Sequence, residues 1–213
     1  PDGKWLVFRS GRGGSESGKA KNLYIMDAEH GESAGIRNLT CGDWVDTMPN
    51  WSPDGEWIVF SSTMDSIHGG EGFGLYMIRP DGTGLHRVTF EKNTGTMEEV
   101  PVYGRVNHAE FSPDSRHLVF TADMAGLSAE PISLPNQFQP YGEIFVSRSD
   151  GSGLVRLTHN AYEDGTPTWT STKIKLHHHD LPYGGPPFVA SSGTEPLRGD
   201  FSEPLWFKAT DEI

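Results

Sequence analysis

A recurring strand–turn–strand motif constrains the fold of this chain more than any other feature. Its most complete copy spans residues 50–60, which read NWSPDGEWIVF. Aromatic and β-branched residues favour strands, whereas Pro, Asp and Gly favour tight turns. The same device occurs at residues 1–10 and 111–121. We therefore expect a fold that is built from repeated antiparallel hairpins.

A second motif follows each hairpin and completes a longer repeat. It reads NLYIMD at 22–27, GLYMIR at 74–79 and EIFVSR at 143–148, and each copy precedes a glycine-containing turn and a short segment ending in Leu-Thr or Val-Thr. Asp2 and Asp54 are 52 residues apart, and Asp54 and Asp114 are 60 apart. A four-strand unit at such a period is typical of propeller blades. We predict an all-β chain, a β-propeller of four-stranded antiparallel blades, with about three and a half to four blades.

The blades are expected to occupy residues 1–170, at about 1–40, 47–89 and 107–158, with a fourth starting at 166. Residues 171–213 depart from the pattern and are expected to hold a divergent last-blade strand and a Pro/Gly-rich tail. Because each blade buries its faces against its neighbours, an open ring exposes apolar surface. We expect a larger ring that a longer parent protein completes, unless the tail closes a small ring or two copies associate.

The combination of WSPDG, LYxM and Leu-Thr at blade spacing resembles the TolB-like, or WD40-like PD40, propeller repeat. The resemblance covers roughly residues 1–170. It extends to plant TolB-related proteins and to the propeller domains of the dipeptidyl-peptidase and acylaminoacyl-peptidase class. It implies the fold, but not the task, because propellers host many functions.

Composition narrows the classes of partner. Asp and Glu number 29 against 17 Lys and Arg, for a net charge of -12. Proteins that bind a phosphate backbone usually carry a basic footprint, so we expect no nucleic-acid partner. No apolar run is long enough for a membrane-spanning helix. Cys41, the one cysteine, excludes an intrachain disulfide, and the glycosylation sequon at Asn38 favours a secretory or extracellular location.

Meander topology predicts a short-loop face and a long-loop face. The long connections are expected at about 10–21, 41–47, 62–73, 90–108, 122–142 and 159–166, and together they contain 12 acidic and 5 basic residues. Variable loops on a rigid scaffold often carry function. The alternatives are a solvated acidic surface and a docking face for a basic or polar partner.

The first strand of each blade, here called the inner strand, is expected to line the central channel. Asp46 and Asp164 precede Pro49 and Pro167 by three residues, and His108 lies near the matching place in the third blade. We predict a binding site at the channel mouth formed by Asp46, His108 and Asp164, which could hold a cation or ordered water. The alternative is that the two carboxylates satisfy backbone amides.

Two further patterns suggest a metal or a phosphate. His177 and His179 would share one face of a strand and could supply two metal ligands, with Asp46 and Asp164 as further candidates, although exposed histidines are the alternative. Residues 13–20 nearly spell a phosphate-binding loop, but the following segment is a strand instead of a helix. We expect no cofactor other than a possible channel cation.

No G-x-S-x-G nucleophile motif occurs in the chain, so we expect no catalytic residues in it. The leading hypothesis is a non-enzymatic propeller that binds a protein, peptide or glycan partner through the long-loop face. The first alternative is the substrate-gating propeller domain of a serine peptidase whose catalytic domain lies elsewhere. The second is a hydrolase or lyase with a metal in the channel.

Overall fold

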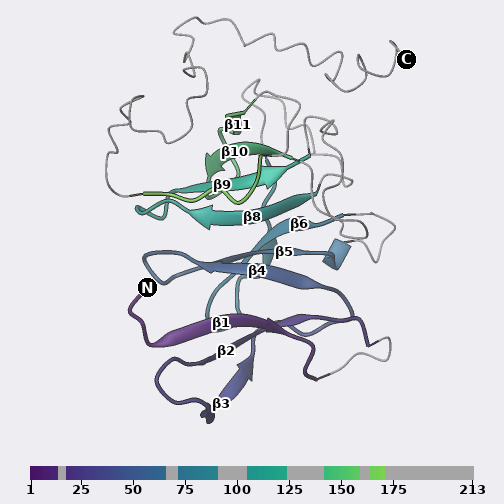
Figure 1. Cartoon of the computed structure of the whole chain (residues 1–213), viewed down its shortest axis with the longest axis vertical. Coiled ribbons are helices and arrows are strands. Elements are labelled where there is room, and N and C mark those ends of the chain that lie inside the picture. The colour runs from purple at the N-terminus through teal and green to yellow at the C-terminus, as the bar shows by residue number, and fades with distance from the viewer. Residues whose placement is uncertain (14–17, 66–71, 91–104, 124–141, 159–163, 171–213) are drawn as a thin grey trace, which may run out of the picture.

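The computed structural model describes residues 1–13, 18–65, 72–90, 105–123, 142–158 and 164–170 (Figure 1). These residues form eleven strands arranged in three antiparallel sheets. Among them, no helix is long and apolar enough to cross a membrane. The predicted all-β architecture is confirmed.

Each sheet is a meander in which strands that follow one another in the chain are neighbours in the sheet. Figure 1 shows the three sheets stacked along the long axis of the molecule, with β1–β3 at the bottom and β8–β11 above β4–β7. The first sheet contains three strands and the other two contain four. The strands are β1 (Trp5–Ser10), β2 (Asn22–Asp27), β3 (Gly31–Asn38), β4 (Asp46–Trp51), β5 (Ile58–Ser62), β6 (Gly74–Ile78), β7 (His86–Arg87), β8 (Val106–Phe111), β9 (His117–Ala122), β10 (Glu143–Arg148) and β11 (Val155–Arg156).

The Ser-Pro-Asp turn between the first two strands of a blade is held by its own side chains. The Ser52 hydroxyl donates a hydrogen bond to Asp54 at 2.6 Å and accepts one from the Trp57 backbone N–H at 2.9 Å. The same two bonds recur at residues 112–117, at 2.5 and 2.9 Å. Side chains of this type stabilise turns by bonding to nearby backbone groups. The most conspicuous motif of the sequence therefore builds the scaffold.

The aromatic positions of the two repeat motifs meet across neighbouring strands. In each sheet a ring from the second strand of the repeat stacks on a ring from the third, with centroids 5.9 Å apart. Such cross-strand aromatic pairs stabilise a sheet beyond the area that they bury. The pairs are Phe8–Tyr24, Phe60–Tyr76 and Phe120–Phe145.

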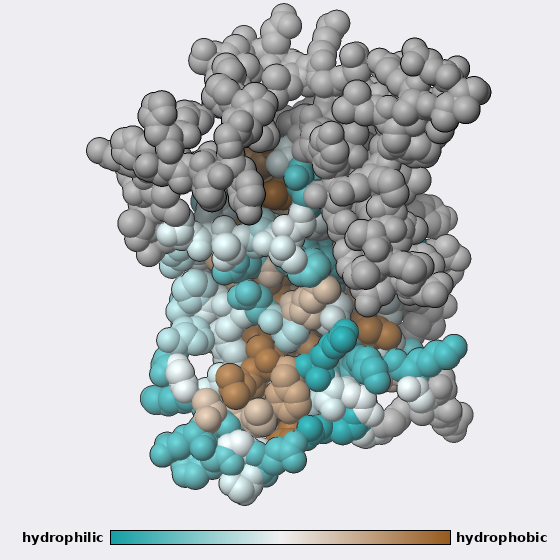
Figure 2. Space-filling model, viewed as in Figure 1, coloured by the Kyte–Doolittle hydropathy of each residue, from teal (hydrophilic) through white to brown (hydrophobic). Residues whose placement is uncertain are grey.

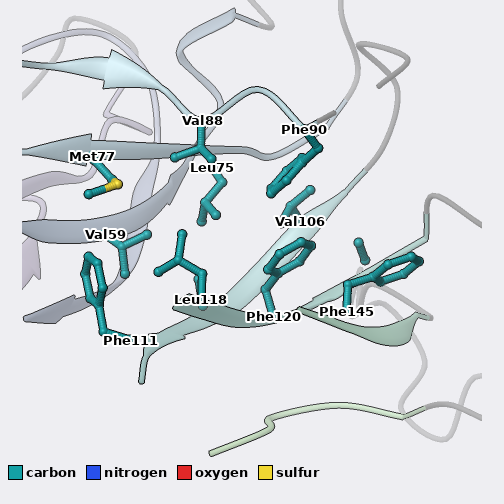
Figure 3. Packing of buried hydrophobic residues seen from close by; sticks show 12 residues of the cluster. Val59, Leu75, Met77, Val88, Phe90, Val106, Phe111, Leu118, Phe120 and Phe145 are labelled. Carbon is teal, nitrogen blue, oxygen red and sulfur yellow. The ribbon is translucent and has the colours of Figure 1, made fainter. Parts of the chain in front are cut away.

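Two apolar clusters join the sheets face to face. One lies between β1–β3 and β4–β7 and includes Leu23, Ile58 and Phe60. The other lies between β4–β7 and β8–β11 (Figure 3), where Val59 and Leu118 point toward one another and the aromatic rings lie beside them. Blades of a propeller depend on such interfaces for much of their stability.

The start of the first sheet is less covered than these interfaces. Trp5 is 52% exposed and Leu6 is 47% exposed, and both lie on β1. Figure 2 shows hydrophobic residues at the surface over the lower sheets. The larger ring expected from the sequence stays a prediction.

One backbone hydrogen bond recurs at every blade junction that the structure describes. The first residue of an inner strand donates its N–H to the carbonyl that precedes the third strand of the preceding blade. The bonds are Asp46 to Lys21 at 2.7 Å, Val106 to Phe73 at 2.9 Å and Asp164 to Gly142 at 3.0 Å. These bonds place residues 46, 106 and 164 at equivalent positions of the repeat.

Residues 164–170, where the first strand of a fourth blade was predicted, are not assigned as a strand. They nevertheless lie against β8, because the Trp169 indole N–H donates a hydrogen bond to the Glu110 carbonyl at 3.2 Å. The segments that would pair with them to form a sheet, from residue 171 onward, lie outside the described residues.

Candidate functional site

Both four-stranded sheets carry a β-bulge in the inner strand. In β4, the pairing of Thr47 with Ser61 is followed by that of Asn50 with Val59, so two residues oppose the single residue Phe60. In β8, two residues oppose Phe120 in the same way. A bulge leaves the extra residue outside the ladder and re-aims the side chains that follow it.

The bulges share an unusual backbone conformation. Met48, His108 and Thr166 have φ values of 51°, 52° and 49°, and each lies two residues after a junction residue. Non-glycine residues rarely adopt this left-handed conformation, which costs on the order of 1–3 kcal/mol and is enriched at functional sites. Three blades therefore present the same strained residue at the same place.

The two bulges and the matching segment at Thr166 surround an open cavity of about 290 Å³. Its lining consists of three equivalent tripeptides, one from each inner strand or its counterpart: residues 48–50, 108–110 and 166–168. Because the inner strands begin at the long-loop face, the cavity lies about two residues below that face. Concave sites of this kind, with a few polar groups on a rigid frame, are common ligand sites.

His108 is the predicted site residue that lines the cavity. Its Nδ1 is buried and has no hydrogen-bond partner among the described residues. Burial lowers the pKa of His108 below its usual value, because removing the ring from water disfavours the charged form. The imidazole is therefore neutral at pH 7 and adds no positive charge to the cavity.

Asp46 occupies a different place from the one predicted. Its side chain is 0% exposed, accepts hydrogen bonds from the Thr40 hydroxyl at 2.6 Å and the Trp44 indole N–H at 3.2 Å, and does not line the cavity. Burial raises the pKa of Asp46, and hydrogen bonds from Ser62, Thr40 and Trp44 oppose that shift. In this position the carboxylate ties two blades together.

Asp164 also lies outside the cavity lining, and its backbone N–H makes the junction bond to Gly142. Within the described part of the chain, no three His, Cys, Asp or Glu side chains gather closely enough to hold a metal ion. Asp46, His108 and Asp164 thus do not form one cluster. His177 and His179 lie outside the described residues, and metal binding there stays a prediction.

The structure describes only some of the acidic residues that were predicted to lie on the long-loop face. Seven of the 12 acidic residues in the long connections lie outside the described residues. Of the others, Asp65 pairs with Arg87 at 2.8 Å, and Asp123 accepts a hydrogen bond from the Arg105 N–H at 2.6 Å. Burial raises the pKa of Asp123. These two carboxylates contribute to the scaffold.

Sequence reasoning did not identify the cavity itself. One signal was available, namely the matching spacing of Asp46–Pro49 and Asp164–Pro167, which marks the strand segment that bulges. The local sequence does not predict a residue in the left-handed conformation, because Met, His and Thr have no shared preference for it. Glu110 and Asn50 were therefore not recognised as cavity residues.

Comparison with solved structures identifies the propeller type. The structure of the putative TolB from Agrobacterium tumefaciens matches with a TM-score of 0.53 and 23% identity, over 79% of this chain and 51% of that chain. The chain has a TolB-like β-propeller fold. TolB from Acinetobacter baumannii matches with a TM-score of 0.49 and 16% identity, over 78% of this chain and 32% of that chain. The Agrobacterium match confirms, at the level of the fold, the TolB-like resemblance seen in the repeat motifs.

A curated relative of the TolB-like chain is a protein of Bacillus subtilis (strain 168) called uncharacterized peptidase YuxL. The two are 34% identical over 146 residues, which is 58% of this chain and 21% of the relative. The chain therefore spans about a fifth of that relative's length and about half of the Agrobacterium TolB chain. No protein-family model matches the chain.

Proposed function

We propose that this TolB-like propeller is a non-catalytic module that binds a polypeptide segment in the cavity between its inner strands. The observation that carries the proposal is the convergence of three equivalent segments, each with a left-handed residue and two of them β-bulges, on one cavity of about 290 Å³. Three strained residues at the same repeat position need stable support from the surrounding sheets, and such strain is enriched at binding sites. The rigid apolar clusters on either side of β4–β7 supply that support.

The cavity also connects to the partner-binding face that the sequence predicts. β4 and β8 start at the long-loop face, and their bulges follow two residues later. A polypeptide that docks on this face can therefore place one side chain in the cavity while its backbone stays among the loops. Specificity would come from the cavity and most of the contact area from the face.

A second candidate function is supported by the match to the Bacillus peptidase. That match favours a role as the propeller part of a peptidase, in which the cavity takes up peptides for a hydrolytic site elsewhere. The absence of a G-x-S-x-G motif from this sequence agrees with such a division of labour. Both candidates require peptide binding by the propeller, and they differ in whether a catalytic domain accompanies it.

Peptide binding can be tested by NMR titration of the isotope-labelled chain. The probes are capped pentapeptides, acetyl-Ala-Ala-X-Ala-Ala-amide, with X varied over the amino acids. We expect chemical-shift changes to centre on residues 48–50, 108–110 and 166–168. Thr168 is exposed and lines the cavity, so Thr168→Trp should fill the cavity and abolish these changes.

The matched control is Leu85→Trp, which introduces the same side chain at an exposed position outside the cavity lining. This variant should bind the probes as the wild type does. The proposal fails if no probe shifts the cavity residues, or if Thr168→Trp leaves the shifts unchanged. Cleavage of a probe by the purified chain would contradict the non-catalytic assignment.

A further inference from the structure

The charged groups of the cavity indicate which side chain it accepts, an inference that rests on the proposed peptide binding. The lining contains one carboxylate, Glu110, and no Lys or Arg. Its other polar groups are the Asn50 amide, the His108 ring and the hydroxyls of Thr166 and Thr168. The cavity is therefore rich in hydrogen-bond acceptors and carries a negative charge.

Glu110 has no counter-ion within the described part of the chain. It is half-buried on β8, and no Lys or Arg among the described residues forms an ion pair with its carboxylate. Its backbone is fixed, because its carbonyl accepts the Trp169 indole N–H at 3.2 Å. A partly desolvated carboxylate on a fixed backbone attracts a cation more strongly than one in bulk water.

His108 strengthens this preference for a hydrogen-bond donor. The buried Nδ1 has no hydrogen-bond partner among the described residues, and an unpartnered buried polar atom is costly. Because Nδ1 is buried, a ligand N–H in the cavity would meet the other ring nitrogen, Nε2, which accepts a hydrogen bond when the proton is on Nδ1. A ligand carboxylate would instead face Glu110 and would be repelled.

The apolar residues of the lining fit the hydrocarbon part of a long basic side chain. Met48, Pro49 and Pro167 present hydrocarbon surface beside the polar groups. Lysine and arginine combine a hydrocarbon stem with a charged, donor-only head, so one side chain could use both kinds of surface. At about 290 Å³ the cavity is slightly smaller than the usual ligand site, which spans roughly 300–1,000 Å³.

We propose that the cavity binds a basic side chain, lysine or arginine, of a polypeptide, with Glu110 as its counter-ion. The net charge of -12 adds a long-range attraction for a basic partner. Glu110 is then the residue that determines specificity, and His108 and Asn50 are positioned to accept hydrogen bonds from the ligand head.

The test compares two capped probes that differ only at the centre, acetyl-Ala-Ala-Lys-Ala-Ala-amide and its norleucine counterpart. Norleucine keeps the hydrocarbon stem and lacks the ammonium group. We expect the lysine probe to bind at least about tenfold more tightly, since a charge-assisted hydrogen bond in a partly buried site is worth that much. A glutamate probe should bind least of the three.

The variant Glu110→Gln removes the charge and preserves the shape of the side chain. It should bring the affinity of the lysine probe down to that of the norleucine probe, without changing the latter. The matched control is Glu56→Gln, which removes a carboxylate on the short-loop face and should leave the lysine preference intact. Thermal unfolding of both variants shows whether they are folded, and the three wild-type titrations test the preference without any substitution.

The outcomes separate the two proposals. Equal binding of the lysine and norleucine probes, with shifts at the cavity residues, would overturn the basic-side-chain inference and leave peptide binding standing. A lysine preference that survives in folded Glu110→Gln protein would overturn the role of Glu110. If no probe reaches the cavity, peptide binding and the inference both fail.

Discussion

Truncation of the stacked phenylalanines tests whether the blades are packed as the structure indicates. Phe120 is 0% exposed, and its ring stacks on Phe90 at 4.7 Å and on Phe145 at 5.9 Å. Figure 3 shows the three rings side by side in the cluster that joins two blades. Removing a fully buried phenylalanine ring costs about 3–5 kcal/mol. We therefore expect Phe120→Ala to lower the free energy of unfolding by about 4 kcal/mol.

Phe8 and Phe60 supply an internal comparison, because each stacks on a tyrosine of the next strand with ring centroids 5.9 Å apart. Phe60 is 0% exposed, so Phe60→Ala should cost as much as Phe120→Ala. Phe8 is only half-buried in the three-stranded sheet, with the Arg12 guanidinium 5.2 Å from its ring centroid. Phe8→Ala should therefore cost about 1–2 kcal/mol, roughly half of a full burial.

Urea unfolding followed by circular dichroism measures the three costs, and thermal unfolding provides a second reading. For a chain of this size about 1 kcal/mol corresponds to roughly 2–4 °C in Tm. We therefore expect a decrease of about 8–16 °C for Phe120→Ala and about 2–8 °C for Phe8→Ala. Equal costs at Phe8 and Phe120 would refute the reasoning, since the first blade would then be buried as deeply as the others. A cost below about 1 kcal/mol at Phe120 would refute the assigned core.

The remaining predictions concern carboxylates of the scaffold. Hydrogen bonds from the Ser112 side chain and the Arg116 backbone lower the pKa of Asp114 below its usual 3.8, so its stabilising contribution is present above pH 3.8 and is lost as the pH falls through the lower, folded pKa. Asp114→Asn should therefore lose less stability than the wild type between pH 5 and about pH 2 in acid unfolding, and an unchanged pH profile would contradict this. For Asp46 the pKa is raised by burial, so the charged form opposes folding above pH 3.8. In urea unfolding at pH 7, Asp46→Asn should then lower the free energy of unfolding by less than about 1 kcal/mol. Asp46→Ala leaves the Thr40 hydroxyl without its acceptor and should lower it by about 1–3 kcal/mol. Equal losses in the two variants would argue against a desolvated carboxylate.

Much of the scaffold could be predicted because its determinants are local. The Ser52–Trp57 turn closes through bonds among residues at most five positions apart, so the residue types suffice to recognise it. The fold class and the antiparallel order of strands were accessible for the same reason. The aromatic pairs are less local, because they join strands that the long connections link, and their register is seen only in the folded sheet.

The placement of the site residues was less accessible, because it depends on a bulge. Alternation along a regular strand would put Asp46 and the residue two positions later, Met48, on the same face. The extra residue and the left-handed φ at Met48 interrupt that alternation, and the carboxylate becomes buried while the bulge faces the cavity. The predicted grouping of Asp46 with His108 rested on their nearly matching places in the repeat, which differ by two residues because the equivalent of Asp46 is Val106.

The sequence by itself determined the repeat, the turns and the TolB-like propeller type, since each depends on residues that are close in the chain or recur at blade spacing. Only the tertiary structure decided which side chains meet at the channel. The cavity joins residues 48–50, 108–110 and 166–168, which are about sixty positions apart and come together because the blades stack. Contacts between blades depend on packing across two sheets, which a local sequence pattern does not specify. For that reason the sequence could not show that Glu110 lines the cavity without a counter-ion among the described residues.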